Sequence, residues 1–198
     1  MDNVKKLEKV KEEIIKNNLP LFDTAKNLVF GKGNPNAKIM FIGEAPGEKE
    51  DEQGIPFVGS AGKELDRLLS SIGLKIEDVY IANILKYRPP KNRNPSINEI
   101  ETHTPYLIKQ IEIIKPKIIA TLGNYSTKFI LASFDTKRMK NIIGITNLHG
   151  VVRSLNINGM EFFVIPLFHP AAVLYNPGLK SVLEDDFIKM KNFLDEHL

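Results

Sequence analysis

Apolar residues along the chain follow two different spacings, and the change between them marks helices and strands. Residues 3–18 place apolar positions three and four apart, which predicts an amphipathic helix, and Pro20 marks its end. The same helical spacing returns in residues 60–72 and 97–114. Between these helices lie unbroken apolar runs of strand length, which we expect to be buried strands, at 38–43, 79–85 and 117–123.

The second half of the chain completes this alternation. A short helix is expected over 124–133, and a hairpin follows because an Asn-Gly pair separates two β-rich runs. Its second arm, 161–168, supplies the fourth core strand, and helical spacing resumes from Leu183 to Leu194. Such alternation predicts an α/β fold, a three-layer α/β/α sandwich around a central, mostly parallel four-stranded sheet. We expect one domain spanning residues 1–198.

Composition narrows the class of protein. Hydrophobic residues make up 42% of the chain and charged residues 26%, which is typical of a globular protein. The apolar runs are too short to span a membrane and the N-terminus is charged, so we expect a cytoplasmic protein without membrane contact. The chain has no cysteine, which excludes disulfides, thiolate metal sites and cysteine nucleophiles. The spacing of the four histidines indicates no metal site.

Each of the four expected core strands is followed by a loop with distinctive chemistry. The carboxyl ends of parallel strands meet at one edge of a sheet, where ligands bind in α/β folds. We therefore expect these loops to gather around one site. Their sequences are GEAPG, NILKYRPPKNRNP, LGNYS and FHPAAVLYNP.

The first loop holds a carboxylate on a stiff turn. Gly43 and Gly47 free the backbone around Glu44, while a proline stiffens it. The Glu44 carboxylate could orient water or stabilise a cation, or it could cap a helix. We interpret the acidic residues at 48–52 as a solvated rim. Phe57 could pack in the core or stack on a ligand.

The second loop combines a buried amide with positive charge. Asn83 lies within an apolar strand, and an unpaired buried amide costs roughly 1–3 kcal/mol, so its side chain should bond either the backbone or the edge of a ligand. Four basic residues follow, which fit either phosphate contacts or an ordinary exposed loop: Lys86, Arg88, Lys91 and Arg93. A formal net charge of +3 permits a polyanionic partner.

The fourth loop begins with a histidine at a strand end. His169 could donate a hydrogen bond into a cleft or serve a structural purpose. The apolar residues that follow, Val173, Leu174 and Tyr175, fit either core packing or a wedge that enters a base stack.

Taken together, these loops resemble the uracil-DNA glycosylase superfamily, and most of all its family 4 of bacteria and archaea. The residues that carry the resemblance are GEAPGEKEDEQGIPFVGSAG, ANILKYRPPKNRNP, LGNYS and FHPAAVL, between Val29 and Pro177. The resemblance implies a monofunctional glycosylase that flips uracil out of DNA and hydrolyses its N-glycosidic bond, in base excision repair. It implies uracil-containing DNA as partner and enzymes that process abasic sites downstream. We also expect a monomer.

The resemblance also implies roles for individual residues. Glu44, Asn92 and His169 act in catalysis, with His169 bonding uracil O2. Phe57 stacks on the flipped uracil, and Asn83 reads its edge. The loop residues Gly43, Ala45 and Gly47 border the scissile bond. Residues that fill the gap left in the duplex are Ala171, Val173, Leu174 and Tyr175, while the four basic residues of the second loop contact DNA.

One departure from the family pattern concerns a cofactor. Family 4 members generally hold a [4Fe–4S] cluster on cysteines, but Tyr87 occupies one of those positions here and a second falls near His103. We therefore expect no cluster and no other cofactor. We hypothesise that Tyr87 and apolar neighbours such as Leu21, Phe22 and Tyr106 fill the space of the cluster.

Three alternatives stay open on the sequence. The chain could be a glycosylase for another deaminated base, hypoxanthine or xanthine, or a non-catalytic DNA-binding relative. It could also be a phosphate-transfer enzyme that uses its Gly-rich turn. That turn lacks the Walker lysine and hydroxyl, and its acidic residues would repel phosphate.

Overall fold

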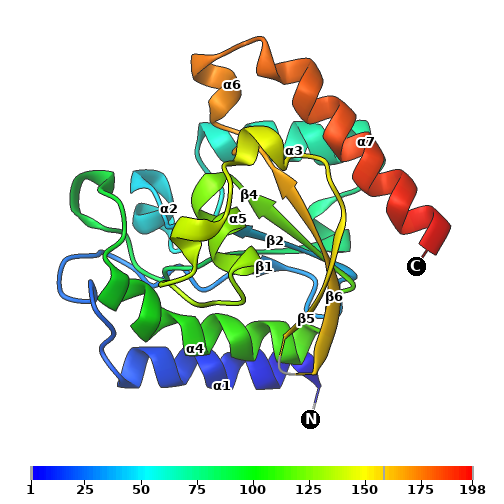
Figure 1. Cartoon of the computed structure of the whole chain (residues 1–198). Coiled ribbons are helices and arrows are strands. Elements are labelled where there is room, and N and C mark those ends of the chain that lie inside the picture. Colours follow the sequence, from blue (N-terminus) through cyan, green and yellow to red (C-terminus); the bar gives the residue numbers. More distant parts are fainter. Residues whose placement is uncertain (1, 158, 198) are drawn as a thin grey trace.

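The computed structural model describes residues 2–157 and 159–197, and its centre is a six-stranded sheet (Figure 1). The strand order is β1-β3-β2-β4-β6-β5. Four central strands are mutually parallel, and β1 and β5 join the two edges in antiparallel orientation. The strands are β1 (Lys32–Gly33), β2 (Ile39–Gly43), β3 (Val79–Asn83), β4 (Ile118–Leu122), β5 (Arg153–Ile157) and β6 (Met160–Leu167).

The parallel core confirms the predicted fold class, but the prediction of four strands is wrong because both edge strands were left out. β1 is only two residues long and carries no apolar pattern. β5 was expected only as the first arm of the hairpin, and it extends the sheet through its pairing with β6. Of the predicted Asn-Gly turn, Asn158 lies outside the described residues.

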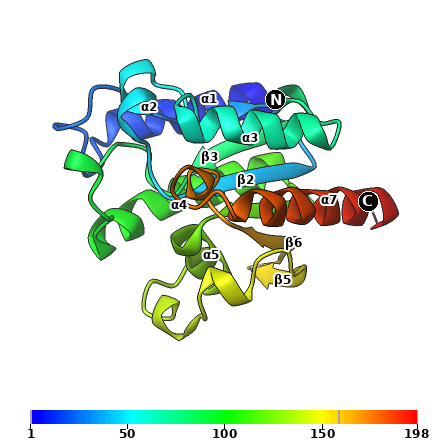
Figure 2. The ribbon, with the colours of Figure 1, turned by 90° about the horizontal axis from the view of Figure 1, so that it is seen from above.

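Helices cover both faces of the sheet. Figure 1 shows α1 and α4 below it and α3 and α7 above it, and the view from above in Figure 2 shows α3 and α7 side by side. No helix in the described part of the chain is long and apolar enough to cross a membrane. The helices are α1 (Asn3–Lys16), α2 (Glu48–Gln53), α3 (Ser60–Ser71), α4 (Ile97–Ile114), α5 (Asn124–Leu131), α6 (Ala172–Tyr175) and α7 (Leu179–His197).

Strand periodicity explains the two cores. Successive side chains of a strand point to opposite faces, so β2 sends Met40 and Ile42 to the side of α1, α4 and α5. Ile39 and Phe41 point to the side of α3 and α7, where the Phe41 ring stacks on Phe187 at 5.9 Å. All five residues of β2 are buried. The unbroken apolar runs of the sequence therefore reflect a sheet covered on both faces.

The fully buried side chain of His103 joins three segments that are distant in sequence. Its Nδ1 accepts the Lys86 N–H at 2.9 Å, so its Nε2 carries the proton and donates to the Pro20 carbonyl at 3.0 Å. The Tyr87 ring meets the His103 ring edge-on at 6.1 Å and also contacts Phe22. These contacts attach the segment after α1 to the loop after β3 and to α4.

This bridge predicts a stability that depends on pH. Burial lowers the pKa of His103 from 6.5 to about 4. The unfolded state therefore binds more protons between these values, so the contribution is complete above the unfolded pKa and is lost as the pH falls toward 4. The linkage amounts to about 3 kcal/mol. In urea unfolding at about pH 7 and about pH 4, His103→Gln should lose less stability on acidification than the wild type by about this amount.

The matched control is His197→Gln, which changes an exposed histidine near the C-terminus. It should follow the wild-type dependence on pH. Equal slopes for wild type and His103→Gln would show that the His103 bridge makes no such contribution.

Candidate active site

The loops at the carboxyl ends of the parallel strands enclose a pocket of about 430 Å³. It brings together the carboxylate, phenyl ring, amides and imidazole that the sequence singles out, although up to 125 positions separate them along the chain. Figure 1 shows α2 and α6 near this edge. The predicted site residues that line the pocket are Glu44, Ala45, Gly47, Phe57, Asn83, Asn92, Arg93, His169 and Ala171.

Gly43 allows two of these groups to approach each other. A β-carbon on Gly43 would lie 2.3 Å from the Asn83 amide oxygen and 2.9 Å from the tip of the Phe57 ring. Both distances are far below van der Waals contact, so only a glycine leaves room for both side chains. Asn83 and Phe57 are 2% and 6% exposed and thus form the buried floor of the pocket.

His169 is held as a neutral hydrogen-bond donor. The Ala171 N–H donates to His169 Nδ1 at 3.2 Å, which leaves the ring proton on Nε2. Burial lowers the pKa of His169, so the imidazole is uncharged at neutral pH. Its ring faces the Phe57 ring, with centroids 5.8 Å apart and planes inclined by 29°.

Glu44 stands on a backbone that the neighbouring loop fixes. The N–H groups of Ile84 and Leu85 donate to the carbonyls of Gly43 and Glu44 at 3.0 and 3.1 Å, so the loops after β2 and β3 are joined. Burial raises the pKa of the Glu44 carboxyl. Burial thus disfavours the charged carboxylate, and a positive charge nearby would favour it.

Glu50 is a site residue that the sequence did not reveal. Its carboxylate accepts the N–H groups of Val58 and Gly59 at 2.9 and 2.8 Å and lines the pocket. The interpretation of residues 48–52 as a solvated rim is wrong for Glu50 and also for Asp51, which is 3% exposed. The available signal for such an acceptor was the expected start of a helix at Ser60, because backbone N–H groups around a helix start need acceptors.

The basic loop differs most from expectation. Lys86 is wrong as a DNA contact, because its side chain is fully buried and donates to the Asn83 carbonyl at 2.8 Å and to Gln110 at 2.6 Å. Burial lowers the pKa of Lys86 to about 7. Arg88 donates to the Asn92 side-chain oxygen at 2.8 Å and so orients that amide.

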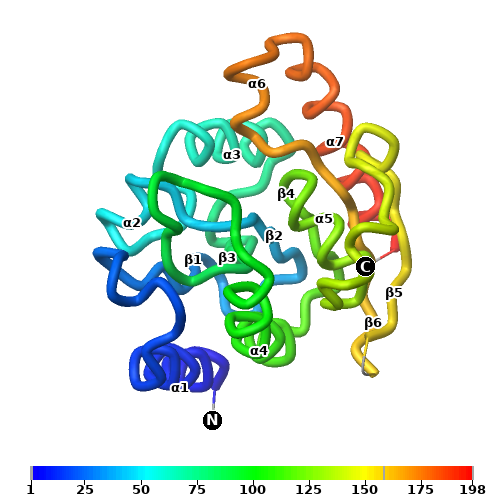
Figure 3. Tube along the Cα trace, turned by 60° about the vertical axis from the view of Figure 1, so that its left-hand side comes forward, coloured from blue at the N-terminus to red at the C-terminus, as the bar shows by residue number. Residues whose placement is uncertain are grey.

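The other two cations of this loop lie at the surface. Arg93 forms a two-pronged ion pair with Glu99, at 2.5 and 2.9 Å. Lys91 is exposed and has no ion pair among the described residues. Figure 3 shows this loop beside α2, in keeping with a weak contact of 3.8 Å between Arg88 and Glu48. Of the four predicted phosphate contacts, Lys91 is thus the most available.

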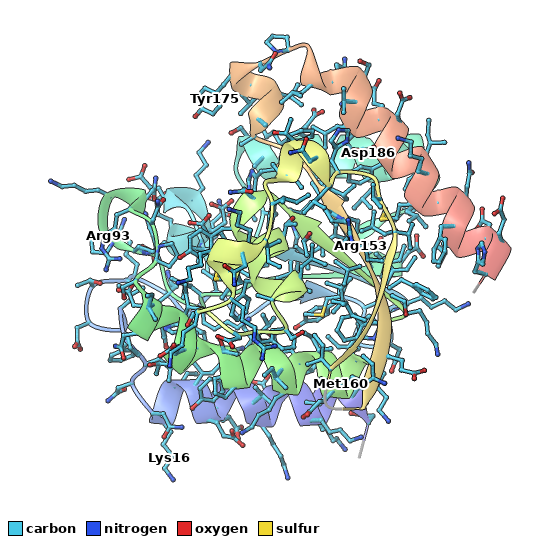
Figure 4. The ribbon with its side chains drawn as sticks, in the orientation of Figure 1. Lys16, Arg93, Arg153, Met160, Tyr175 and Asp186 are labelled. Carbon is cyan, nitrogen blue, oxygen red and sulfur yellow. The ribbon has the colours of Figure 1, made fainter. Side chains whose placement is uncertain are left out.

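The segment after His169 turns from the pocket to the surface. Ala171 lines the pocket, and Val173 packs against the core on the α7 side. The next two side chains are large, apolar and unsupported, with Leu174 53% and Tyr175 88% exposed. Figure 4 shows Tyr175 projecting from α6 at the outer end of this segment.

The residues at the expected cluster positions do not fit an iron–sulfur cluster. The chain has no cysteine, Tyr87 is 2% exposed, and both ring nitrogens of His103 are engaged in hydrogen bonds. Tyr87, Tyr106 and Leu21 pack in one apolar cluster with residues of α1, and Phe22 contacts the Tyr87 ring. Within the described residues, no three acidic or histidine side chains form a group suited to a metal ion.

An α/β/α fold with a pocket at the carboxyl ends of its parallel strands is shared with a known class of protein. The model of the uracil DNA glycosylase superfamily matches residues 30–192, and the chain belongs to that superfamily. Several of its relatives are type-4 uracil-DNA glycosylases. It is 48% identical to a type-4 uracil-DNA glycosylase of Sulfurisphaera tokodaii, over 93% of this chain and 83% of that protein.

Two further relatives carry the same description. A type-4 uracil-DNA glycosylase of Saccharolobus solfataricus is 47% identical over 98% of this chain and 84% of its own length. One of Archaeoglobus fulgidus is 46% identical over 86% of this chain and 83% of its own length. The resemblance to the superfamily and its family 4 is thereby confirmed.

The pocket floor predicts the effect of one added methyl group. Gly43→Ala should force apart the Asn83 and Phe57 side chains, and such overpacking typically costs about 1–3 kcal/mol of unfolding free energy. The control is Gly144→Ala, whose β-carbon would meet its nearest neighbour at 3.7 Å and which should change stability by less than about 0.5 kcal/mol. Chemical denaturation measures both variants. Equal unfolding free energies for the two variants would mean that the pocket floor can accommodate a methyl group at position 43.

Proposed function

We propose that this protein is a monofunctional uracil-DNA glycosylase, which removes uracil from DNA by hydrolysis of the N-glycosidic bond. The observation that carries the proposal is the convergence of Glu44, Phe57, Asn83 and His169 on one base-sized pocket. A base within a duplex hides its glycosidic bond, so the nucleotide must first be flipped into this pocket. The names of the type-4 relatives support uracil as the base.

The rings of the pocket restrict how a base can enter. A base sandwiched between two rings needs about 7 Å between them, twice a contact distance of about 3.5 Å. Phe57 and His169 are 5.8 Å apart, so the uracil does not lie between them. We infer that it stacks on Phe57 with one face and meets His169 with its edge. An edge-on approach directs the Nε2 proton of His169 at a carbonyl oxygen.

The charges of the pocket suit the transition state. Cleavage leaves positive charge on the sugar and negative charge on the departing base, by analogy with glycoside hydrolysis. Glu44 stabilises the sugar cation and helps to place the attacking water, while the neutral His169 donates to uracil O2 as charge develops there. Asn92, oriented by Arg88 at the rim, assists in placing water.

Specificity follows from the Asn83 amide. An amide offers one acceptor and one donor, which match uracil N3–H and O4. Cytosine presents an unprotonated nitrogen and an amino group at those positions, so binding it would leave buried polar groups unpaired.

The surface around the pocket suits DNA, and the protein works without a cofactor. Lys91 contacts phosphates, and Leu174 and Tyr175 enter the stack to hold the base out. We propose that it acts as a cytoplasmic monomer without an iron–sulfur cluster, because Tyr87 and His103 serve packing and hydrogen bonding instead. The abasic product would pass to enzymes that process such sites.

The proposed function is tested with a uracil-containing oligonucleotide in EDTA, followed by alkali. Abasic sites should form without added metal, and alkali should then break the strand at the former uracil. No strand break is expected before alkali, because the proposed mechanism involves no lysine Schiff base. Matched oligonucleotides with hypoxanthine or xanthine separate the related activities. Binding of the uracil strand without base release would refute the proposal.

Two substitutions test the assignment of the pocket. His169→Ala and Asn83→Ala should each slow single-turnover uracil release by at least about tenfold, because loss of one such donor typically costs roughly 10²–10³ in rate. Controls are His197→Ala and Asn36→Ala, two exposed residues away from the pocket. Near-normal release by both pocket variants would defeat the site assignment.

A further inference from the structure

The backbone of Phe57 has a conformation that its neighbours must maintain. Its φ of 52° lies in the left-handed region, which costs a bulky residue of the order of 1–3 kcal/mol. With this backbone the Phe57 ring lines the pocket, and the chain enters α3 at Ser60. The relaxed alternative would move the ring, so whatever holds this peptide also holds the stacking surface.

Two charged side chains hold the peptide group between Phe57 and Val58, one at its carbonyl and the other at its N–H. Glu50 accepts the next two N–H groups, and the Lys32 ammonium donates to the Phe57 carbonyl at 2.9 Å. That carbonyl also abuts Gly62 of α3, where a β-carbon would lie 2.0 Å from the oxygen. The carbonyl oxygen is therefore confined between the start of α3 and the Lys32 ammonium.

Lys32 reaches this carbonyl from a strand that is itself fixed. It pairs with Ile81 across β1 and β3 and is flanked by Gly31 and Gly33. β-Carbons on these glycines would lie 2.5 Å from the Tyr80 hydroxyl and 2.1 Å from the Val79 carbonyl, so β1 lies closer to β3 than any larger residue would allow. The close packing of β1 on β3 thus fixes the backbone of Lys32.

We propose that Lys32 is a positioning residue for the Phe57 ring, acting through the hydrogen bond from its ammonium to the Phe57 carbonyl. The role in base recognition rests on the proposed function, whereas the role in holding the peptide does not. Lys32 is half-buried, and this burial lowers its pKa while Asp66 and Glu50 raise it. The Lys32 ammonium gives up hydration to bond a loop carbonyl, so it acts on that loop.

The test replaces Lys32 with methionine, which keeps the length of the side chain and removes the donor. Lys32→Met should slow single-turnover uracil release about tenfold, since a 1 Å misplacement at a reacting centre can cost about 10²-fold. Binding to a duplex that already holds an abasic site should stay within about twofold, because that duplex offers no base to the ring. Lys32→Arg keeps a donor and should recover most of the rate.

Hydrogen–deuterium exchange provides a readout that does not depend on activity. In Lys32→Met the amides of Val58 and Gly59 should exchange about tenfold faster, while β2 and β4 keep their protection. The control Lys75→Met removes the same charge from an exposed residue near β1, away from the pocket, and should change neither measurement.

The outcomes separate the two proposals. Wild-type release and wild-type exchange in Lys32→Met would overturn the role of Lys32, as would an equal loss of release and of abasic-duplex binding. If the wild-type protein releases no uracil, the proposed function fails, and the exchange of Val58 and Gly59 still decides whether Lys32 holds the peptide.

Discussion

The pocket depends on one buried amine. Lys86 lies directly behind Asn83, and its Nζ donates to the Asn83 carbonyl and to Gln110 on α4. Its own N–H donates to His103, and its carbonyl accepts from Val29. Three segments therefore meet at this one residue: the end of β3, α4 and the segment around Val29. A buried amine is costly unless it is hydrogen-bonded, so this arrangement tolerates few alternatives and fixes the peptide that carries the Asn83 amide.

Charged residues around the pocket likewise hold neighbouring groups in place. Glu50, Arg88 and Lys32 each bond a group next to a predicted contact residue: the amides after Phe57, the Asn92 side chain and the Phe57 carbonyl. Few of these charges are free to meet a ligand directly. The proposed base contacts are thus neutral groups, an amide, a phenyl ring and an imidazole, and charged residues bond the groups beside them. Neutral groups lose less hydration when a flat, uncharged base enters.

The sequence allowed the parallel core and most of the pocket-lining residues to be predicted, because strand periodicity and the order of the motifs are local properties. It did not reveal the edge strand β1, since its two residues, Lys32 and Gly33, carry no apolar pattern. Nor did it separate Lys86 from Lys91, although both are lysines in one basic loop. Their difference is one of burial, which depends on Gln110 and His103 some 17 to 24 positions away. Glu50 and Lys32 were missed for the same reason: their partners are backbone groups, which every residue possesses.

The two ends of the sheet have a consequence for how copies of the protein behave toward each other. One margin is the two-residue β1, and the other is β5, whose Arg153, Ser154 and Asn156 are exposed. Edge strands that are short or carry exposed polar side chains pair poorly with a strand from another molecule. Natural sheets avoid edge-to-edge aggregation in this way. Neither edge of the sheet therefore favours the addition of a strand from a second copy of the chain.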